Sequence, residues 1–154
     1  ARTEGQRRAM WARREVAAEL SQGWHDEAVD TDVAVPPDAV DAFMTQVHAR
    51  LPALDPGAET LTVAHLGDGN LHFTVRPSRQ DPALADAVVT LVEDVVAELG
   101  GSFSAEHGVG LSKRASMARR KDPVAIEVMR ALKAALDPAG LLNPGKILPD
   151  ILPG

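Results

Sequence analysis

The chain has 154 residues, which is about the length of one domain. With 45% hydrophobic and 25% charged residues, its composition is that of a folded globular protein and excludes a disordered chain. The sequence holds no cysteine, which excludes disulfides, thiolate metal sites and cysteine nucleophiles. Its net charge of −6 argues against general nucleic-acid binding, and no apolar run approaches the ~18 residues that a membrane span needs.

Hydrophobic periodicity and turn residues divide the chain into helices and strands. Five segments are predicted to be helical, at residues 6–22, 40–51, 82–99, 111–120 and 123–136. Three segments alternate like strands, at residues 28–35, 59–66 and 71–76. Pro36 is expected to end the first strand and Pro52 the second helix. Because the one clear link between strands is a hairpin, we predict an α+β fold with helices on one face of an antiparallel sheet.

The predicted hairpin carries two histidines. Its strands are joined by Gly67-Asp-Gly-Asn70, a sequence typical of tight turns. A four-residue turn there sets His65 opposite His72, with Cβ atoms ~5 Å apart. Strand alternation gives one face Val63, His65, His72 and Thr74, and gives the core face Ala64, Leu66, Leu71, Phe73 and Val75. Two imidazoles paired in this way can hold a divalent cation, although the spacing alone also fits two polar residues facing water.

A second candidate group follows the short extended stretch at residues 102–106. Glu106 can complete a two-histidine, one-carboxylate metal site, which leaves coordination positions open for substrate. Consecutive residues of a strand face opposite ways, so Glu106 and His107 share a site only if the chain bends. Gly108 and Gly110 make such a bend easy. Taken alone, the pair also fits an exposed loop.

Three motifs in the sequence are each several residues long. They are His65-Leu-Gly-Asp-Gly-Asn-Leu-His72, Glu106-His-Gly-Val-Gly110, and a tail from Leu136 through Asn143-Pro-Gly-Lys146 to Pro149. Together with the stretches that begin at Trp11 and Asp32, they resemble the C-terminal cap domain of FAD-linked 2-hydroxyacid dehydrogenases. That family includes D-2-hydroxyglutarate dehydrogenase, D-lactate dehydrogenase and the glycolate oxidase flavin subunit. The resemblance covers about residues 10 to 149.

The resemblance implies a role for each matching residue. His65, His72 and Glu106 correspond to ligands of a divalent metal, Zn first, with Fe or Mn as alternatives. His107 corresponds to the general base, and Arg14 to a clamp for the substrate carboxylate, which a planar guanidinium suits. The reaction implied is oxidation of a D-2-hydroxy acid to a 2-oxo acid, with hydride passing to the flavin of FAD. For Arg14, a solvated surface arginine is the alternative.

The sequence departs from the hydroxyglutarate-type pattern at three positions. Ala18 stands where those relatives have a substrate-binding threonine, and Asp30 stands roughly where they have a lysine. Thr74, which we expect to contact substrate, replaces an asparagine. Loss of a cation and gain of an anion disfavour a second substrate carboxylate. We therefore expect a monocarboxylate or otherwise different 2-hydroxy acid.

The resemblance also implies a division of the chain and a set of partners. Residues 1–136 correspond to the C-terminal part of a ferredoxin-like substrate cap. Residues 137–154 correspond to a tail that returns to an FAD-binding domain of the same polypeptide, where Asn143 would contact the flavin. A helix stop followed by a surface loop is the alternative for this tail. The chain has no glycine-rich pyrophosphate loop of its own, so alone it is expected to be inactive.

Without the FAD-binding domain, this chain would expose a strand edge and apolar surface, and we expect two copies to pair as a homodimer that covers them. The expected location is the cytoplasm, or the surface of a membrane through the electron acceptor. Two other functions stay open on the residues alone. One is a stand-alone module that binds metal or carboxylates without redox activity, and the other is metal-dependent hydrolysis.

Overall fold

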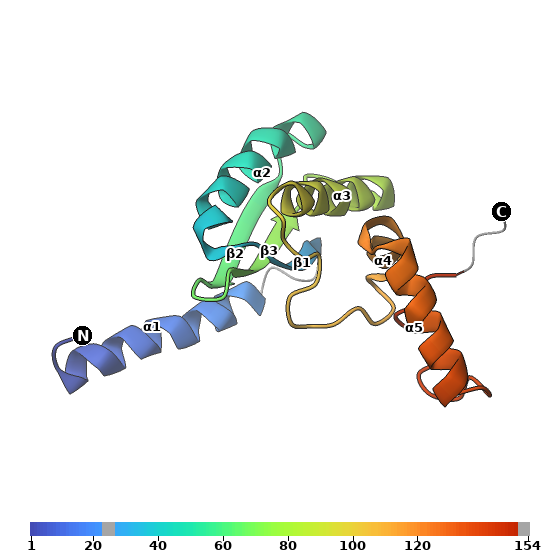
Figure 1. The fold of residues 1–154 in the computed structure, drawn as a ribbon. Coiled ribbons are helices and arrows are strands. Elements are labelled where there is room, and N and C mark those ends of the chain that lie inside the picture. Colours follow the sequence, from blue (N-terminus) through green and yellow to red (C-terminus); the bar gives the residue numbers. More distant parts are fainter. Residues whose placement is uncertain (23–26, 151–154) are drawn as a thin grey trace.

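The computed structural model describes residues 1–22 and 27–150, with side chains in the same ranges except 17–22. Its helices are α1 (Glu4–Gln22), α2 (Val40–Leu54), α3 (Pro82–Glu98), α4 (Arg114–Arg120) and α5 (Pro123–Leu136), with a short 3-10 turn, η2, at Pro37–Ala39. Its strands are β1 (Val29–Ala34), β2 (Glu59–His65) and β3 (Asn70–Arg76). Figure 1 shows the sheet with α2 and α3 on one side, α1 reaching away from it, and α4 and α5 beyond its other end.

The strands form one antiparallel sheet in the order β1-β3-β2, so β3 lies in the centre. Helices α2 and α3 cover one face of this sheet. Phe73 of β3 is fully buried there and meets Phe43 of α2 edge to face, with ring centroids 5.6 Å apart. Valines of α3, among them Val88 and Val92, complete the core. The predicted α+β fold with helices on one face of an antiparallel sheet is therefore confirmed.

The register of the hairpin differs from the prediction. His65 lies opposite Asn70, and Val63 lies opposite His72. The turn comprises residues 66–69, one residue earlier than predicted, because Asn70 already belongs to β3. Since each pairing shifts by an even number of residues, His65 and His72 stay on the same face. Leu66, predicted to face the core, instead lies in the turn and is 65% exposed.

Two predicted helix ends are also wrong. Pro52 does not end α2 but lies inside its last turn, and the helix continues to Leu54. Proline has a helical φ, but its ring removes the hydrogen bond to the carbonyl of His48 and crowds that carbonyl, and the helix continues only two residues beyond it. Helix α4 begins at Arg114 rather than at residue 111. Gly110, with φ at +52°, directs residues 111–113 into turns instead.

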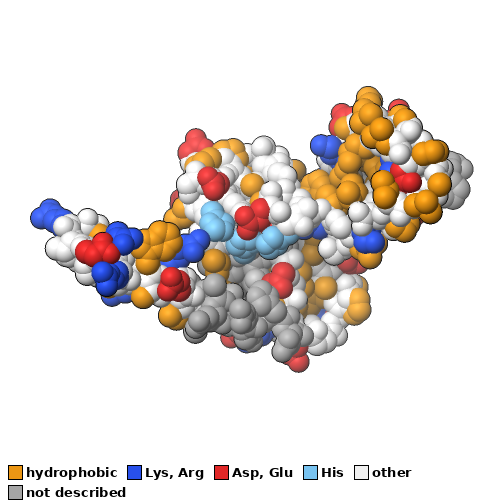
Figure 2. Space-filling view, turned by 90° about the horizontal axis from the view of Figure 1, so that it is seen from below, with side chains coloured by type: hydrophobic (Ala, Val, Ile, Leu, Met, Phe, Trp, Pro, Cys, Tyr) orange, Lys and Arg blue, Asp and Glu red, His pale blue; other side chains and the backbone are white. Residues whose placement is uncertain are grey.

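Helix α5 leaves much of its apolar surface open. Ile126 is the buried side chain of this helix in the described structure. Four large apolar residues spaced four apart are exposed along it: Val124, Val128, Leu132 and Leu136. Figure 2 shows hydrophobic side chains gathered on the part of the molecule that contains α5. None of the helices in the described ranges is both long enough and apolar enough to cross a membrane.

Candidate functional site

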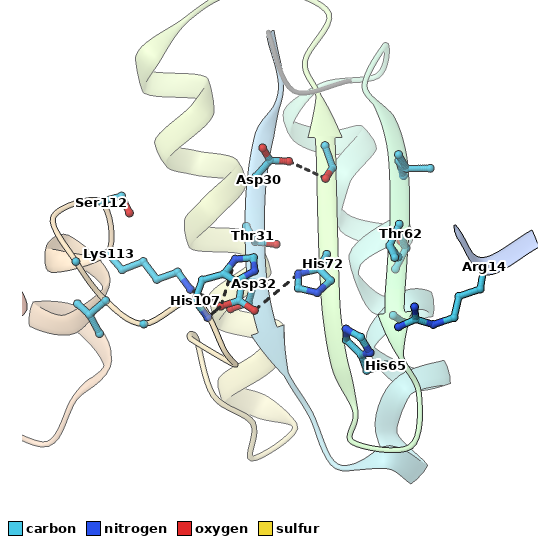
Figure 3. Close-up of a pocket in the computed structure, with 17 residues that line it drawn as sticks. Arg14, Asp30, Thr31, Asp32, Thr62, His65, His72, His107, Ser112 and Lys113 are labelled. Atoms are coloured by element: carbon cyan, nitrogen blue, oxygen red, sulfur yellow. Dashed lines mark hydrogen bonds and ion pairs between the residues drawn. The ribbon is translucent and has the colours of Figure 1, made fainter. Parts of the chain in front are cut away.

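The face of the sheet that α2 and α3 leave uncovered carries a cavity of about 800 Å³. Side chains from all three strands project into it, as Figure 3 shows, and α1 and the segment before α4 form its sides. Its polar lining residues are Arg14, Asp30, Thr31, Asp32, Thr62, His65, His72, Thr74, His107, Ser112 and Lys113. The histidines of this face are visible together in Figure 2.

The structure brings together the three residues predicted as metal ligands. Glu106 Oε1 lies 3.0 Å from Nε2 of His72 and 3.8 Å from Nε2 of His65. The two imidazole rings meet edge to face, with centroids 5.7 Å apart. The side chains of all three are partly open to solvent, so an ion and a substrate can reach the nitrogen and oxygen atoms.

His107 joins the same group. Its ring stacks on that of His72, with centroids 5.0 Å apart and an interplanar angle of 20°. Its Nε2 lies 3.7 Å from Glu106 Oε1, and its side chain is 63% exposed. The chain therefore bends between Glu106 and His107, as a shared site requires. Gly108, which follows directly, has φ at +71°, a conformation that glycine adopts without strain.

Asp32 also lies in this group, although the sequence pattern gave it no role. One oxygen or nitrogen atom from each of Asp32, His72, Glu106 and His107 lies within 4.8 Å of the others, and among the described residues the predicted ligand His65 is not part of this tighter set. Asp32 comes from the middle of β1, directly opposite His72 on β3. The one signal in the sequence is a second aspartate, two positions after Asp30, in a strand that is otherwise mostly apolar.

The Asp32 carboxylate holds the loop that carries Glu106 and His107. It accepts hydrogen bonds from the backbone N–H groups of Ala105, Glu106 and His107, and from Nζ of Lys113 at 2.8 Å. Burial alone would raise the pKa of Asp32. The ammonium of Lys113 and the loop N–H groups outweigh burial and hold the pKa at about 2, so the group is charged near neutral pH.

Arg14 approaches the cavity from α1. Its guanidinium carbon lies 5.5 Å from the centre of the Trp11 ring, which braces the side chain by a cation–π contact. Figure 3 shows the guanidinium reaching over β2 toward His65. Ala18, the position of a departure from the hydroxyglutarate-type pattern, has a side chain outside the described residues.

Asp30 and Thr74 lie further along the same face of the sheet. They are direct neighbours across β1 and β3, and the Thr74 hydroxyl donates to Asp30 Oδ1 at 2.7 Å. Both line the cavity, and Thr74 is 5% exposed. An acidic group therefore stands on the cavity wall beyond the histidines.

Asn143 does not join the other predicted residues. It lies in the tail after α5, is exposed, and is not part of the cavity lining in the described structure. Its φ of +46° is in the left-handed region, which asparagine tolerates better than most residues. The start of the tail is held by Asp137, which accepts from the N–H groups of Leu141 and Leu142.

The chain is similar to known proteins over most of its length. Residues 1–147 match the family described as FAD linked oxidases, C-terminal domain. The chain is 35% identical over 150 residues to a D-2-hydroxyglutarate dehydrogenase of Stutzerimonas stutzeri, covering 94% of this chain and 32% of that protein. It is 39% identical over 142 residues to the mitochondrial D-2-hydroxyglutarate dehydrogenase of Bos taurus, covering 91% of this chain and 25% of that protein.

A third relative carries a different substrate name. A probable mitochondrial D-lactate dehydrogenase of Danio rerio is 35% identical over 125 residues, which cover 79% of this chain and 25% of that protein. The chain thus spans about a third or less of the length of these relatives. With a family match over residues 1–147, this chain belongs to the C-terminal domains of FAD-linked oxidases, a family of oxidoreductases.

Proposed function

We propose that this chain is the substrate- and metal-binding part of an FAD-dependent enzyme that oxidises a D-2-hydroxy acid to a 2-oxo acid. One observation carries the proposal. His65, His72, Glu106 and His107 converge on the open face of the sheet, and Arg14 lies at the rim of the same cavity. The group thus offers metal ligands, a base and a carboxylate clamp in one place.

The donor set fits a divalent metal. Two imidazole nitrogens and one carboxylate oxygen suit Zn, with Fe or Mn as the other candidates, and leave positions open for a substrate. In our proposal His65, His72 and Glu106 hold the ion. When bound, the ion would polarise the substrate hydroxyl and make its proton easier to remove.

The remaining groups have separate tasks in this proposal. His107 takes the hydroxyl proton at Nε2, since an imidazole accepts a proton near neutral pH and this side chain is accessible. Arg14 pairs with the substrate carboxylate by two parallel hydrogen bonds. When bound, FAD would supply the hydride acceptor. Gly69 packs against the backbone of Val35 in the hairpin turn, so this turn is not a pyrophosphate loop, and we assign the flavin to another part of the polypeptide.

The cavity wall supports a substrate without a second carboxylate. Asp30 places a negative charge beside Thr74, where a longer substrate would extend. A dicarboxylate would meet repulsion there, whereas D-lactate has no second carboxylate to be repelled. We expect the full-length protein to prefer D-lactate over D-2-hydroxyglutarate, and Asp30→Asn to reduce that preference. D-lactate serves as the internal reference, because its kcat/KM should change less in Asp30→Asn than that of D-2-hydroxyglutarate. A clear preference of the unaltered protein for D-2-hydroxyglutarate would refute this assignment.

The proposal extends to partners. Residues 1–136 would form the substrate cap and residues 137–154 the tail toward the FAD-binding domain, where Asn143 would contact the flavin. The apolar stripe on α5 offers surface for that domain or for a second copy of the chain. A location in the cytoplasm stays a prediction, and two of the relatives named above are mitochondrial proteins by name.

The experiment that tests the function is a visible absorption spectrum of the full-length protein, taken before and after addition of D-lactate, D-2-hydroxyglutarate and glycolate. Bleaching of a flavin band by one acid would establish the oxidoreductase and its substrate class. His72→Ala should abolish bleaching without loss of the flavin. A colourless protein that binds Zn²⁺ would instead identify a metal-binding module without redox activity.

A further inference from the structure

We propose that the ion pair between Asp32 and Lys113 is a positioning device that sets Glu106 and His107 against the two hairpin histidines. The proposal deepens the proposed function, because it concerns how the metal ligand and the base are held. Neither Asp32 nor Lys113 is given a role in binding the substrate or the ion. Their task is to fix a loop that has no helix or strand structure of its own.

The first support is the number of groups that converge on Asp32. Four donors of the described structure point to its two carboxylate oxygens: three successive backbone N–H groups, of Ala105, Glu106 and His107, and the ammonium of Lys113. All four reach Oδ2, whose accepting capacity they fill, while Oδ1 in the described structure accepts the shared N–H of Glu106 at 3.3 Å. Although Asp32 lies within reach of the cluster, the donors gathered on Oδ2 tie it to the loop. This assigns it to support rather than to ligation.

The second support is the way in which Lys113 closes the arrangement. Its Nζ donates to the Asp32 carboxylate, to the Asp32 backbone carbonyl at 3.2 Å and to the Ser104 hydroxyl at 2.9 Å. An ammonium has three hydrogens, so all three are used. One side chain just before α4 thus ties β1 to both ends of the loop that carries Glu106.

The third support is burial. The Asp32 side chain is 5% exposed and that of Lys113 is 18% exposed, so the pair is shielded from water. Charge-assisted hydrogen bonds are stronger there, and loss of one partner leaves a charge without compensation. The loop beyond Glu106 contains Gly108 in a left-handed conformation, which alone would let the chain turn in several ways. The ion pair holds the loop in the one turn that brings Glu106 against His72.

The test compares two buried aspartates in the full-length protein. Asp32→Asn removes the charge that holds the loop. Asp55→Asn is the matched control, because Asp55 is also buried and also accepts backbone and hydroxyl hydrogen bonds, from Gly57 and Ser78, but outside the cavity lining. Zn²⁺ affinity is measured by competition with a chromogenic chelator. Glu106→Gln shows how much of the binding belongs to this site.

We expect Asp32→Asn to lower Zn²⁺ affinity by about 10- to 100-fold, the range seen when groups that orient metal ligands are removed. Asp55→Asn should leave the affinity unchanged. Lys113→Met is the second variant, in case Asp32→Asn fails to fold, and it should also weaken Zn²⁺ binding, whereas Lys113→Arg should restore part of it. The two losses should not add in Asp32→Asn/Lys113→Met, because both act through one contact. Unchanged affinity in both single variants, or an equal loss in Asp55→Asn, would overturn the proposal.

A second readout separates this proposal from the proposed function. Hydrogen exchange of the amides at residues 105–107 reports the loop directly, with no metal present. If the unaltered protein takes up no Zn²⁺, the metal site is refuted while the positioning of the loop is still decided. Faster exchange in Asp32→Asn but not in Asp55→Asn would support it, and equal exchange in both would overturn it.

Discussion

The hairpin turn between β2 and β3 depends on one glycine and tolerates change at its neighbour. Gly69 has φ at +67°, and a Cβ atom added there would lie 1.9 Å from the carbonyl oxygen of Val35. That backbone cannot move aside freely, because the N–H of Val35 donates to the carbonyl of Gly69 at 3.0 Å. At Gly67, by contrast, an added Cβ meets nothing within 4 Å. Gly69→Ala and Gly67→Ala therefore form a matched pair within one turn.

The size of the effect follows from two terms. Holding alanine in the left-handed conformation costs about 1–2 kcal/mol. Relief of the clash requires the turn to move away from Val35, which loses a hydrogen bond worth about 1 kcal/mol. Gly69→Ala should thus lower the free energy of unfolding by about 2–3 kcal/mol. Gly67→Ala should change it by less than about 0.5 kcal/mol, as surface substitutions do.

The assay is urea unfolding followed by circular dichroism, with the two variants measured beside the unaltered chain. The slope with denaturant should stay the same, so that the shift in midpoint reports stability. Equal stability of the two variants, or a larger loss in Gly67→Ala, would refute the reasoning. It would mean that the approach of the turn to Val35 is not a constraint on the fold.

Three further predictions concern the core, the acid limit of stability and the site. Phe73→Ala removes a fully buried ring and should cost about 4 kcal/mol in urea unfolding, and a loss under about 2 kcal/mol would contradict its place in the core. The hydroxyl and N–H of Ser78 hold the pKa of Asp55 below its usual value. The stability that this carboxylate adds is thus present near neutral pH and lost as the pH falls through the lowered pKa. The difference in free energy of unfolding between Asp55→Asn and the unaltered chain should therefore be larger at pH 7 than at pH 3. Equal differences at both pH values would contradict this. Arg14→Met should lower kcat/KM for D-2-hydroxy acids at least about tenfold, since a charge-assisted hydrogen bond is worth about 1.5–3 kcal/mol. The exposed neighbour Arg13, changed to Met, is the control, and equal effects of the two would argue against a carboxylate clamp.

Much of the architecture was readable from the pattern of side chains. Alternation placed Leu71, Phe73 and Val75 on the buried face of β3 and left His72 and Thr74 on the other, because a strand has a period of two. Because of the same period, the predicted face of the two histidines was correct even though the predicted register was not. The turn lies one residue earlier than predicted and the pairing of His65 was wrong, yet both histidines remained on one face.

The contacts of the site depend on pairings between distant segments, which no local pattern encodes. Asp32 meets the loop of Glu106 only because β1 lies beside β3 and the chain returns to Asp32 at Lys113, 81 residues later in the sequence. Likewise, the sequence placed Arg14 in a helix, but only the packing of α1 against β2 brings its guanidinium to the cavity. Local periodicity therefore determined the elements, their faces and the residue types available for chemistry. The tertiary structure decided which of them meet, because the burial of the core on α2 and α3 determines which face of the sheet stays open.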